Sequence, residues 1–184
     1  MATAAERPVV LLFSDSICKY IANHVPPSHF KFYVHANRGA KVVDVAADIY
    51  HHHNADFGIP TVVCVHVGTN NLSNGLQEVM GDFDKLIAIA KDRFPTSTIV
   101  MSSILPRLDK RCLDDRRVTV NTELAALCNS RGVRYCNNGE SIDPSMLAVD
   151  CLHLSQRGNV LFADHVFHCL SHFLQIHQLG ERQK

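Results

Sequence analysis

Val9-Val-Leu-Leu-Phe13 is a short apolar run that ends directly in the polar residues Ser14-Asp15-Ser16. Runs of this length and composition are typical of strands that are buried on both faces of a parallel sheet. Four more follow along the chain, at about residues 30–35, 61–67, 98–101 and 133–136. The pattern therefore predicts five strands.

Segments with helical periodicity lie between and after these runs. We expect helices near residues 16–24, 41–53, 76–94, 114–131 and 155–177. The last has one apolar face with a three- or four-residue repeat, formed by Val160, Ala163, Phe167, Leu170 and Leu174. Because strands and helices alternate, right-handed crossovers predict an α/β fold: a three-layer α/β/α sandwich with a five-stranded, parallel, flavodoxin-like sheet.

Length and composition limit the classes of protein to consider. A chain of 184 residues with 46% hydrophobic and 20% charged residues is typical of one globular domain, so we interpret residues 1–184 as a single domain. Lys plus Arg and Asp plus Glu both number 18. This balance disfavours direct binding of nucleic acid by this domain, because no net positive charge attracts a polyanion.

The cysteines and the N-terminal residues bear on location. Seven cysteines are present, none in a C-x-x-C pair, and we interpret them as free thiols in a reducing compartment. The first eight residues lack the apolar core of a secretory signal, and no apolar run reaches membrane-spanning length. These features predict a cytoplasmic location without a transmembrane segment.

Polar residues cluster after the predicted strands, and the carboxyl ends of parallel strands meet at one edge of the sheet, where such folds bind ligands. The clusters are Ser14-Asp15-Ser16, Asn37-Arg38-Gly39, Gly68-Thr69-Asn70-Asn71, Leu105-Pro106-Arg107 and Asp150-Cys151-Leu152-His153. An ester hydrolase needs a nucleophile, a base, a group that orients the base, and donors for an oxyanion. This edge has candidates for each.

Ser16 is the candidate nucleophile, at the start of a predicted helix whose dipole would favour negative charge. Asp150 and His153 have a spacing that lets the carboxylate hold Nδ1 while Nε2 faces Ser16. The backbone N–H groups of Ser16 and Gly39 and the side chain of Asn70 are candidate oxyanion donors. Each has a structural alternative: an N-cap for Ser16, turn chemistry for Gly39 and Asn70, and local loop bonding for Asp150 and His153.

The combination resembles the SGNH/GDSL hydrolases. Ser14-Asp15-Ser16-Ile17 is similar to their Gly-Asp-Ser-Leu block, Gly39 to the second, Gly68-Thr69-Asn70-Asn71 to the third, and Asp150-x-x-His153 to the last. The resemblance implies a Ser16, His153 and Asp150 triad, an oxyanion hole of Ser16, Gly39 and Asn70, and no metal or cofactor. Ser14 and Asn71 depart from the usual glycine and aspartate.

Two groups within this superfamily are similar in detail. An asparagine at the position of Asn71 also occurs in the alpha subunits of intracellular platelet-activating-factor acetylhydrolase, which the chain resembles here. The runs at residues 15–21, 67–72 and 150–155 resemble the esterase domain in the first open-reading-frame protein of vertebrate LINE-type retrotransposons. This resemblance implies a domain of a larger protein that hydrolyses acetyl or short acyl esters, with lipid among the candidate substrates.

Other interpretations stay open at this stage. If the chain has this fold but is catalytically weak or inactive, it would be a module that binds lipid or protein. The oligomeric state is undetermined. Arg107 is either at the mouth of the site or a solvated loop cation. His51-His52-His53 is interpreted as a solvated helix end, because successive helical residues point in different directions. Four residues are candidates for an acyl pocket or for the core: Leu72, Leu105, Met146 and Leu147.

Overall fold

The computed structural model describes residues 7–25, 30–53 and 58–181, with side chains as far as Leu174. Its sheet has five strands: β1 Val9–Ser14, β2 Lys31–Ala36, β3 Val62–His66, β4 Thr98–Ser102 and β5 Arg134–Cys136. The spatial order is β2-β1-β3-β4-β5 and each neighbouring pair is parallel. This is the flavodoxin-like order, so the predicted sheet is confirmed.

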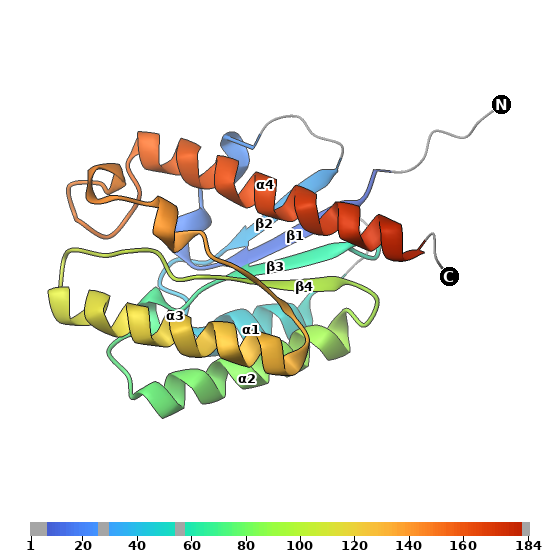
Figure 1. The fold of residues 1–184 in the computed structure, drawn as a ribbon, viewed down its shortest axis with the longest axis horizontal. Coiled ribbons are helices and arrows are strands. Elements are labelled where there is room, and N and C mark those ends of the chain that lie inside the picture. Colours follow the sequence, from blue (N-terminus) through green and yellow to red (C-terminus); the bar gives the residue numbers. More distant parts are fainter. Residues whose placement is uncertain (1–6, 26–29, 54–57, 182–184) are drawn as a thin grey trace.

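Helices cover both faces of the sheet (Figure 1). They are α1 Val42–His51, α2 Leu76–Arg93, α3 Arg111–Arg131 and α4 Gln156–Glu181. Helices α1, α2 and α3 lie on one face, and α4 crosses the other. The β1 side chains alternate between two apolar clusters: Leu11 and Phe13 face the three-helix layer, and Val10 and Leu12 face α4. The predicted three-layer sandwich is therefore confirmed.

The segment after β1 differs from the prediction. In place of a helix over residues 16–24 it has two short 3-10 turns, Ser16–Cys18 and Ile21–Asn23. Cys18 and Ile21 are both fully buried beneath α4. Each turn thus buries one of these side chains in the apolar cluster beneath α4, and the helix-dipole argument for Ser16 does not apply, because a three-residue turn has no helix dipole of that size.

The buried face of α4 is partly the predicted one. Ala163, Leu170 and Leu174 are buried, but Val160, predicted on the same apolar face, is 49% exposed and does not belong to the buried face. Phe162 and Val166 are buried instead. In the described part of the chain, no helix combines the length and apolar character needed to cross a membrane.

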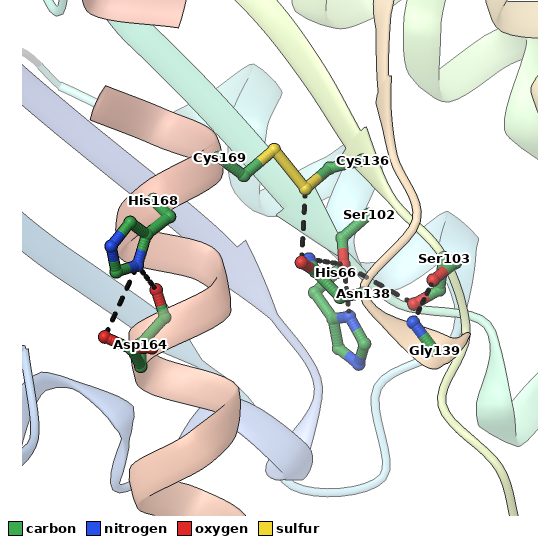
Figure 2. The surroundings of a disulfide bond; sticks show 9 residues. All are labelled: His66, Ser102, Ser103, Cys136, Asn138, Gly139, Asp164, His168 and Cys169. Carbon is green, nitrogen blue, oxygen red and sulfur yellow. Dashed lines mark hydrogen bonds and ion pairs between the residues drawn. A yellow bond between two sulfur atoms is a disulfide. The ribbon is translucent and has the colours of Figure 1, made fainter. Parts of the chain in front are cut away.

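Two cysteines are paired, so the interpretation of all seven as free thiols was wrong. Cys136 at the end of β5 forms a disulfide with Cys169 of α4 (Figure 2). The two lie 33 residues apart in the sequence. They meet because α4 packs back across the sheet, which the spacing of the cysteines does not reveal. The remaining five are free, and three of them are buried: Cys18, Cys64 and Cys128.

Candidate active site

The candidate site lies where the strand order reverses. Strands β1 and β3 are adjacent at the middle of the sheet, and the chain leaves them toward opposite edges. In doubly wound folds the loops that follow such a pair of strands diverge, and ligands bind at the carboxyl edge of the sheet near this point. Ser16 follows β1 and the segment 68–71 follows β3, so the topology places both predicted motifs at this edge of the sheet.

The structure brings the three predicted triad residues together. Ser16 Oγ lies 3.2 Å from Nε2 of His153, and Nδ1 of His153 lies 2.7 Å from Oδ2 of Asp150. The Asp150 and His153 side chains are 49% and 44% exposed, so solvent and solutes reach this pair. The order nucleophile, imidazole and carboxylate is the one that acyl transfer by a serine requires.

Asp150 is built to remain ionised. Its Oδ1 accepts hydrogen bonds from the backbone N–H groups of Leu152 and His153, at 3.0 and 2.9 Å. The hydrogen bond with the His153 side chain, aided by these two, lowers the pKa of Asp150 to about 2. An ionised carboxylate holds the proton on Nδ1 of His153 and leaves Nε2 free to accept a proton from Ser16.

The loop that carries this pair is fixed at both ends. Ala148 N donates to the His153 carbonyl at 2.7 Å, and Ser155 N donates to the Met146 carbonyl at 2.9 Å. Between them Cys151 has φ 57°, a left-handed conformation that is unfavourable for a residue with a side chain. Its carbonyl accepts a hydrogen bond from Leu108 N at 2.8 Å. The surrounding contacts therefore hold a strained residue inside the candidate site.

The two loops with predicted oxyanion donors are joined by hydrogen bonds. Asn70 Nδ2 donates to the Ala40 carbonyl at 3.0 Å, and Asn71 Oδ1 accepts from Val42 N at 3.0 Å. Because an amide nitrogen carries two hydrogens, Asn70 retains a second donor. Gly39 is exposed with φ 72°, a conformation that favours glycine. These bonds hold Gly39 and Asn70 in a defined relation to each other.

Both departures from the family pattern are buried. Ser14 is 1% exposed and its hydroxyl donates to the Asp15 carbonyl at 2.8 Å, so it does not narrow the site. Asn71 Nδ2 is buried without a hydrogen-bond partner among the described residues. The Asn71 oxygen accepts the bond from Val42 N, and a carboxylate oxygen of an aspartate could accept the same bond.

Asp15 lies directly beneath the candidate nucleophile. It is fully buried, and its Oδ1 accepts a hydrogen bond from Ile17 N at 3.0 Å, which caps the turn that carries Ser16. Its Oδ2 finds no partner in the described part of the chain. Burial raises the pKa of Asp15 to about 7, against the opposing effects of the Ile17 hydrogen bond and of nearby His153.

A second serine and histidine pair lies deeper in the protein. His66 Nδ1 is 3.0 Å from Ser102 Oγ, which also accepts a hydrogen bond from Asn138 Nδ2 at 2.9 Å (Figure 2). His66 and Ser102 are only 2% and 1% exposed, and burial lowers the pKa of His66 to about 4. A substrate cannot reach this pair, so we interpret it as a polar link between β3, β4 and the segment after β5.

A pocket of about 330 Å³ opens beside the candidate triad, and Ser16 and His153 both line it. The other lining residues are Lys19, Tyr20, Ala36 and Arg38. The sequence interpretation missed Lys19 and Tyr20 as site residues, although their closeness to Ser16 was a usable signal. The four predicted acyl-pocket candidates do not line it: Leu72, Leu105 and Met146 belong to the core, and Leu147 is half-buried.

Arg107 takes neither of the two predicted roles. It is 8% exposed and is absent from the lining of the pocket, so it is not a solvated cation or a residue at the mouth of the site. His52, predicted in a solvated helix end, is also buried and packs edge-on against Phe13. No group of three or more metal-binding side chains occurs within the described residues.

Solved structures share this fold. A GDSL-like lipase from Bacteroides thetaiotaomicron is 11% identical, with a TM-score of 0.74 over 92% of this chain and 90% of the other. A carbohydrate esterase family 3 protein from Talaromyces cellulolyticus is 16% identical, with a TM-score of 0.73 over 93% and 98%. A lipase/acylhydrolase from Enterococcus faecalis is 14% identical, with a TM-score of 0.70 over 88% and 94%.

Comparisons of sequence give no comparable result. No protein-family description matches the chain, and no curated protein matches it either. At identities of 11 to 16%, the structural likeness establishes a shared fold. The chain thus has the fold of GDSL-like lipases and esterases, with serine, histidine and aspartate side chains joined at the edge where that fold binds ligands.

Proposed function

We propose that this chain is a serine ester hydrolase in which Ser16 is the nucleophile, His153 the general base and Asp150 the residue that orients His153. The observation that carries the proposal is the chain of contacts from Ser16 Oγ through His153 to Asp150, at 3.2 and 2.7 Å, which opens onto a pocket. The names of the structural neighbours, which include lipases and an esterase, support the same class of reaction.

The reaction proceeds through an acyl-enzyme. Ser16 Oγ attacks the ester carbonyl carbon while Nε2 of His153 takes its proton, and the carbonyl oxygen becomes an oxyanion. The backbone N–H groups of Ser16 and Gly39 and the second amide hydrogen of Asn70 stabilise this oxyanion. When the intermediate collapses, the C–O bond breaks and His153 gives its proton to the leaving alcohol. Water then attacks the acyl group by the same route and releases the acid.

The proposed substrates are acetyl or short acyl esters, which suit a pocket of about 330 Å³. Small lipid esters belong to this class. The further assignment to a domain of a retrotransposon-encoded protein rests on the sequence resemblance at residues 15–21, 67–72 and 150–155 alone.

Hydrolysis of p-nitrophenyl esters from acetate to octanoate, with a chelator present, tests the proposal. The wild type should hydrolyse the short esters, and Ser16→Ala and His153→Ala should lower kcat by about a thousandfold or more. A fluorophosphonate probe should label the wild type at Ser16 and should not label Ser16→Ala. Folded wild type that neither hydrolyses esters nor reacts with the probe would instead indicate a module of this fold that binds ligands without turnover.

A further inference from the structure

Two cationic side chains line the same pocket as the nucleophile and the base. Lys19 follows the turn that carries Ser16, and Arg38 lies in the loop after β2. Both are exposed, and the pocket they share with Ser16 and His153 has no acidic residue in its lining. The chain as a whole has a formal net charge of zero, so this positive charge is a local property of the pocket.

Neither cation is neutralised by a described residue. The Lys19 ammonium lies 5.1 Å from the centre of the Tyr20 ring, and no ion pair joins Lys19 or Arg38 to a carboxylate of the described residues. Other arginines of the protein are paired in this way, among them Arg117 with Asp114 and Arg131 with Asp84. Lys19 and Arg38 are therefore available to a bound ligand.

None of the carboxylates that neighbour the pocket residues in the sequence lines the pocket, and none pairs with Lys19 or Arg38 among the described residues. Asp150 is hydrogen-bonded to His153, and Asp15 is fully buried beneath Ser16. In α1, which follows the Arg38 loop, Asp48 accepts a hydrogen bond from Asn37 and Asp44 accepts one from the Lys41 backbone. A negatively charged ligand group would therefore meet unpaired cations beside the ester-cleaving atoms.

We propose that the site selects esters that carry a carboxylate or a phosphate near the scissile bond, and that Lys19 and Arg38 bind this group. The inference rests on the proposed function, since it names the substrate class of the same pocket. An arginine presents a planar fork of donors that fits a carboxylate or a phosphate, and a lysine adds a compact charge. The anionic group can belong to the acyl part or to the alcohol part of the ester, and the test separates the two.

Two matched pairs of soluble esters provide the test. For the acyl side, mono-4-nitrophenyl adipate is compared with 4-nitrophenyl hexanoate; for the alcohol side, 4-acetoxybenzoate is compared with its methyl ester. The ratio of kcat/KM for the anionic ester to that for its neutral partner is measured in the wild type and in Lys19→Met, Arg38→Met and the double variant. Lys85→Met is the control with the same change of charge, because Lys85 is an exposed cation of α2 that does not line the pocket. Rates in Ser16→Ala are subtracted as background.

In at least one pair the wild type should prefer the anionic ester. Each single replacement should lower the ratio roughly threefold to fivefold, as expected for a partly exposed ion pair, and the change should lie mainly in KM. Added salt should lower the ratio in the wild type and have little effect on the ratio in the double variant. Lys85→Met should leave the ratio unchanged.

The outcomes separate this inference from the proposed function. Ser16-dependent hydrolysis with no anionic preference in either pair, or with a preference that survives in the folded double variant, would overturn the inference and leave the esterase intact. If Lys85→Met lowered the ratio as much as Lys19→Met, general charge rather than the pocket would be responsible, which also overturns it. The absence of any Ser16-dependent hydrolysis would overturn both.

Discussion

Arg107 Nη1 donates a hydrogen bond to the backbone carbonyl of Thr69 at 2.9 Å, one residue before the proposed oxyanion donor Asn70. The guanidinium is held by Asp109 through two further bonds, from Nε at 2.8 Å and from Nη2 at 2.6 Å. The adjacent Leu108 N donates to the carbonyl of Cys151, in the loop that carries His153. The segment 107–108 thus contacts the loops of both the proposed oxyanion hole and the base.

We expect Arg107→Met to lower kcat for short esters about tenfold or more with a smaller change in KM, because the Asn70 donor matters most in the transition state. Arg107→Lys, which retains the charge but not the planar fork, should recover part of the loss. Arg131→Met, which removes an exposed ion pair with Asp84, is the control and should keep the wild-type kcat. An Arg107→Met protein that is folded and has the wild-type kcat would show that Arg107 does not position Asn70.

The contribution of Asp15 to the stability of the fold decreases as pH rises, which is the opposite of the usual case for an aspartate. Its pKa is raised to about 7 in the folded protein, compared with 3.8 for an unperturbed aspartate. Between these values the folded chain holds a proton that the unfolded chain has lost, so the contribution of Asp15 to stability falls as pH rises toward 7 and stays low above it. Asp15→Asn removes this effect and keeps an oxygen to accept the Ile17 bond.

Relative to the wild type, Asp15→Asn should therefore gain about 3 kcal/mol of unfolding free energy between pH 5 and pH 8, measured by urea denaturation. Asp143→Asn is the matched control, because Asp143 also caps a 3-10 turn, through Ser145 N, but it is exposed and its pKa is lowered. Its difference from the wild type should be the same at both pH values. A difference for Asp15→Asn that does not change with pH would exclude a raised pKa at this residue.

Gly158, in the first turn of α4, allows the His153 loop to approach the helix. A Cβ atom there would clash with the Met146 carbonyl oxygen, which accepts hydrogen bonds from both the backbone and the side chain of Ser155. Gly158→Ala should destabilise the protein by about 2 kcal/mol or more and lower kcat, because the loop must move away. Gly81→Ala, in the open middle of α2, should instead raise stability by about 0.5 to 1 kcal/mol.

Thermal and urea unfolding of the two glycine variants, together with ester hydrolysis, provide the measurement. If Gly158→Ala were as stable and as active as Gly81→Ala, the close contact between α4 and Met146 would be contradicted.

The sheet could be predicted because its signal is local. A run such as Val9–Phe13 is apolar throughout since both of its faces are covered, and five such runs define the layers. The three side chains of the candidate triad could be expected to lie together, because Ser16 and the loop from Asp150 to His153 both lie at the predicted edge of the sheet. Arg107 could not be assigned, because its role depends on a carbonyl 38 residues away in the sequence. The turns after β1 were missed because Cys18 and Ile21 are held by packing under α4, which local propensity does not contain.

The disulfide between Cys136 and Cys169 is the long-range contact that the sequence least revealed, and it has a direct chemical test. Of the seven cysteines, five are free, so five thiols should react with Ellman's reagent in denaturant without reductant, and seven after reduction. A cross-link across 33 residues should stabilise the fold by about 3 to 4 kcal/mol, largely by restricting the unfolded chain. Reductant should therefore lower the melting temperature of the wild type and of Cys112→Ser, whose thiol is exposed and free, but not that of Cys136→Ser. Seven reactive thiols before reduction would show that the chain folds without this cross-link, and α4 would then be held to the sheet by its apolar face alone.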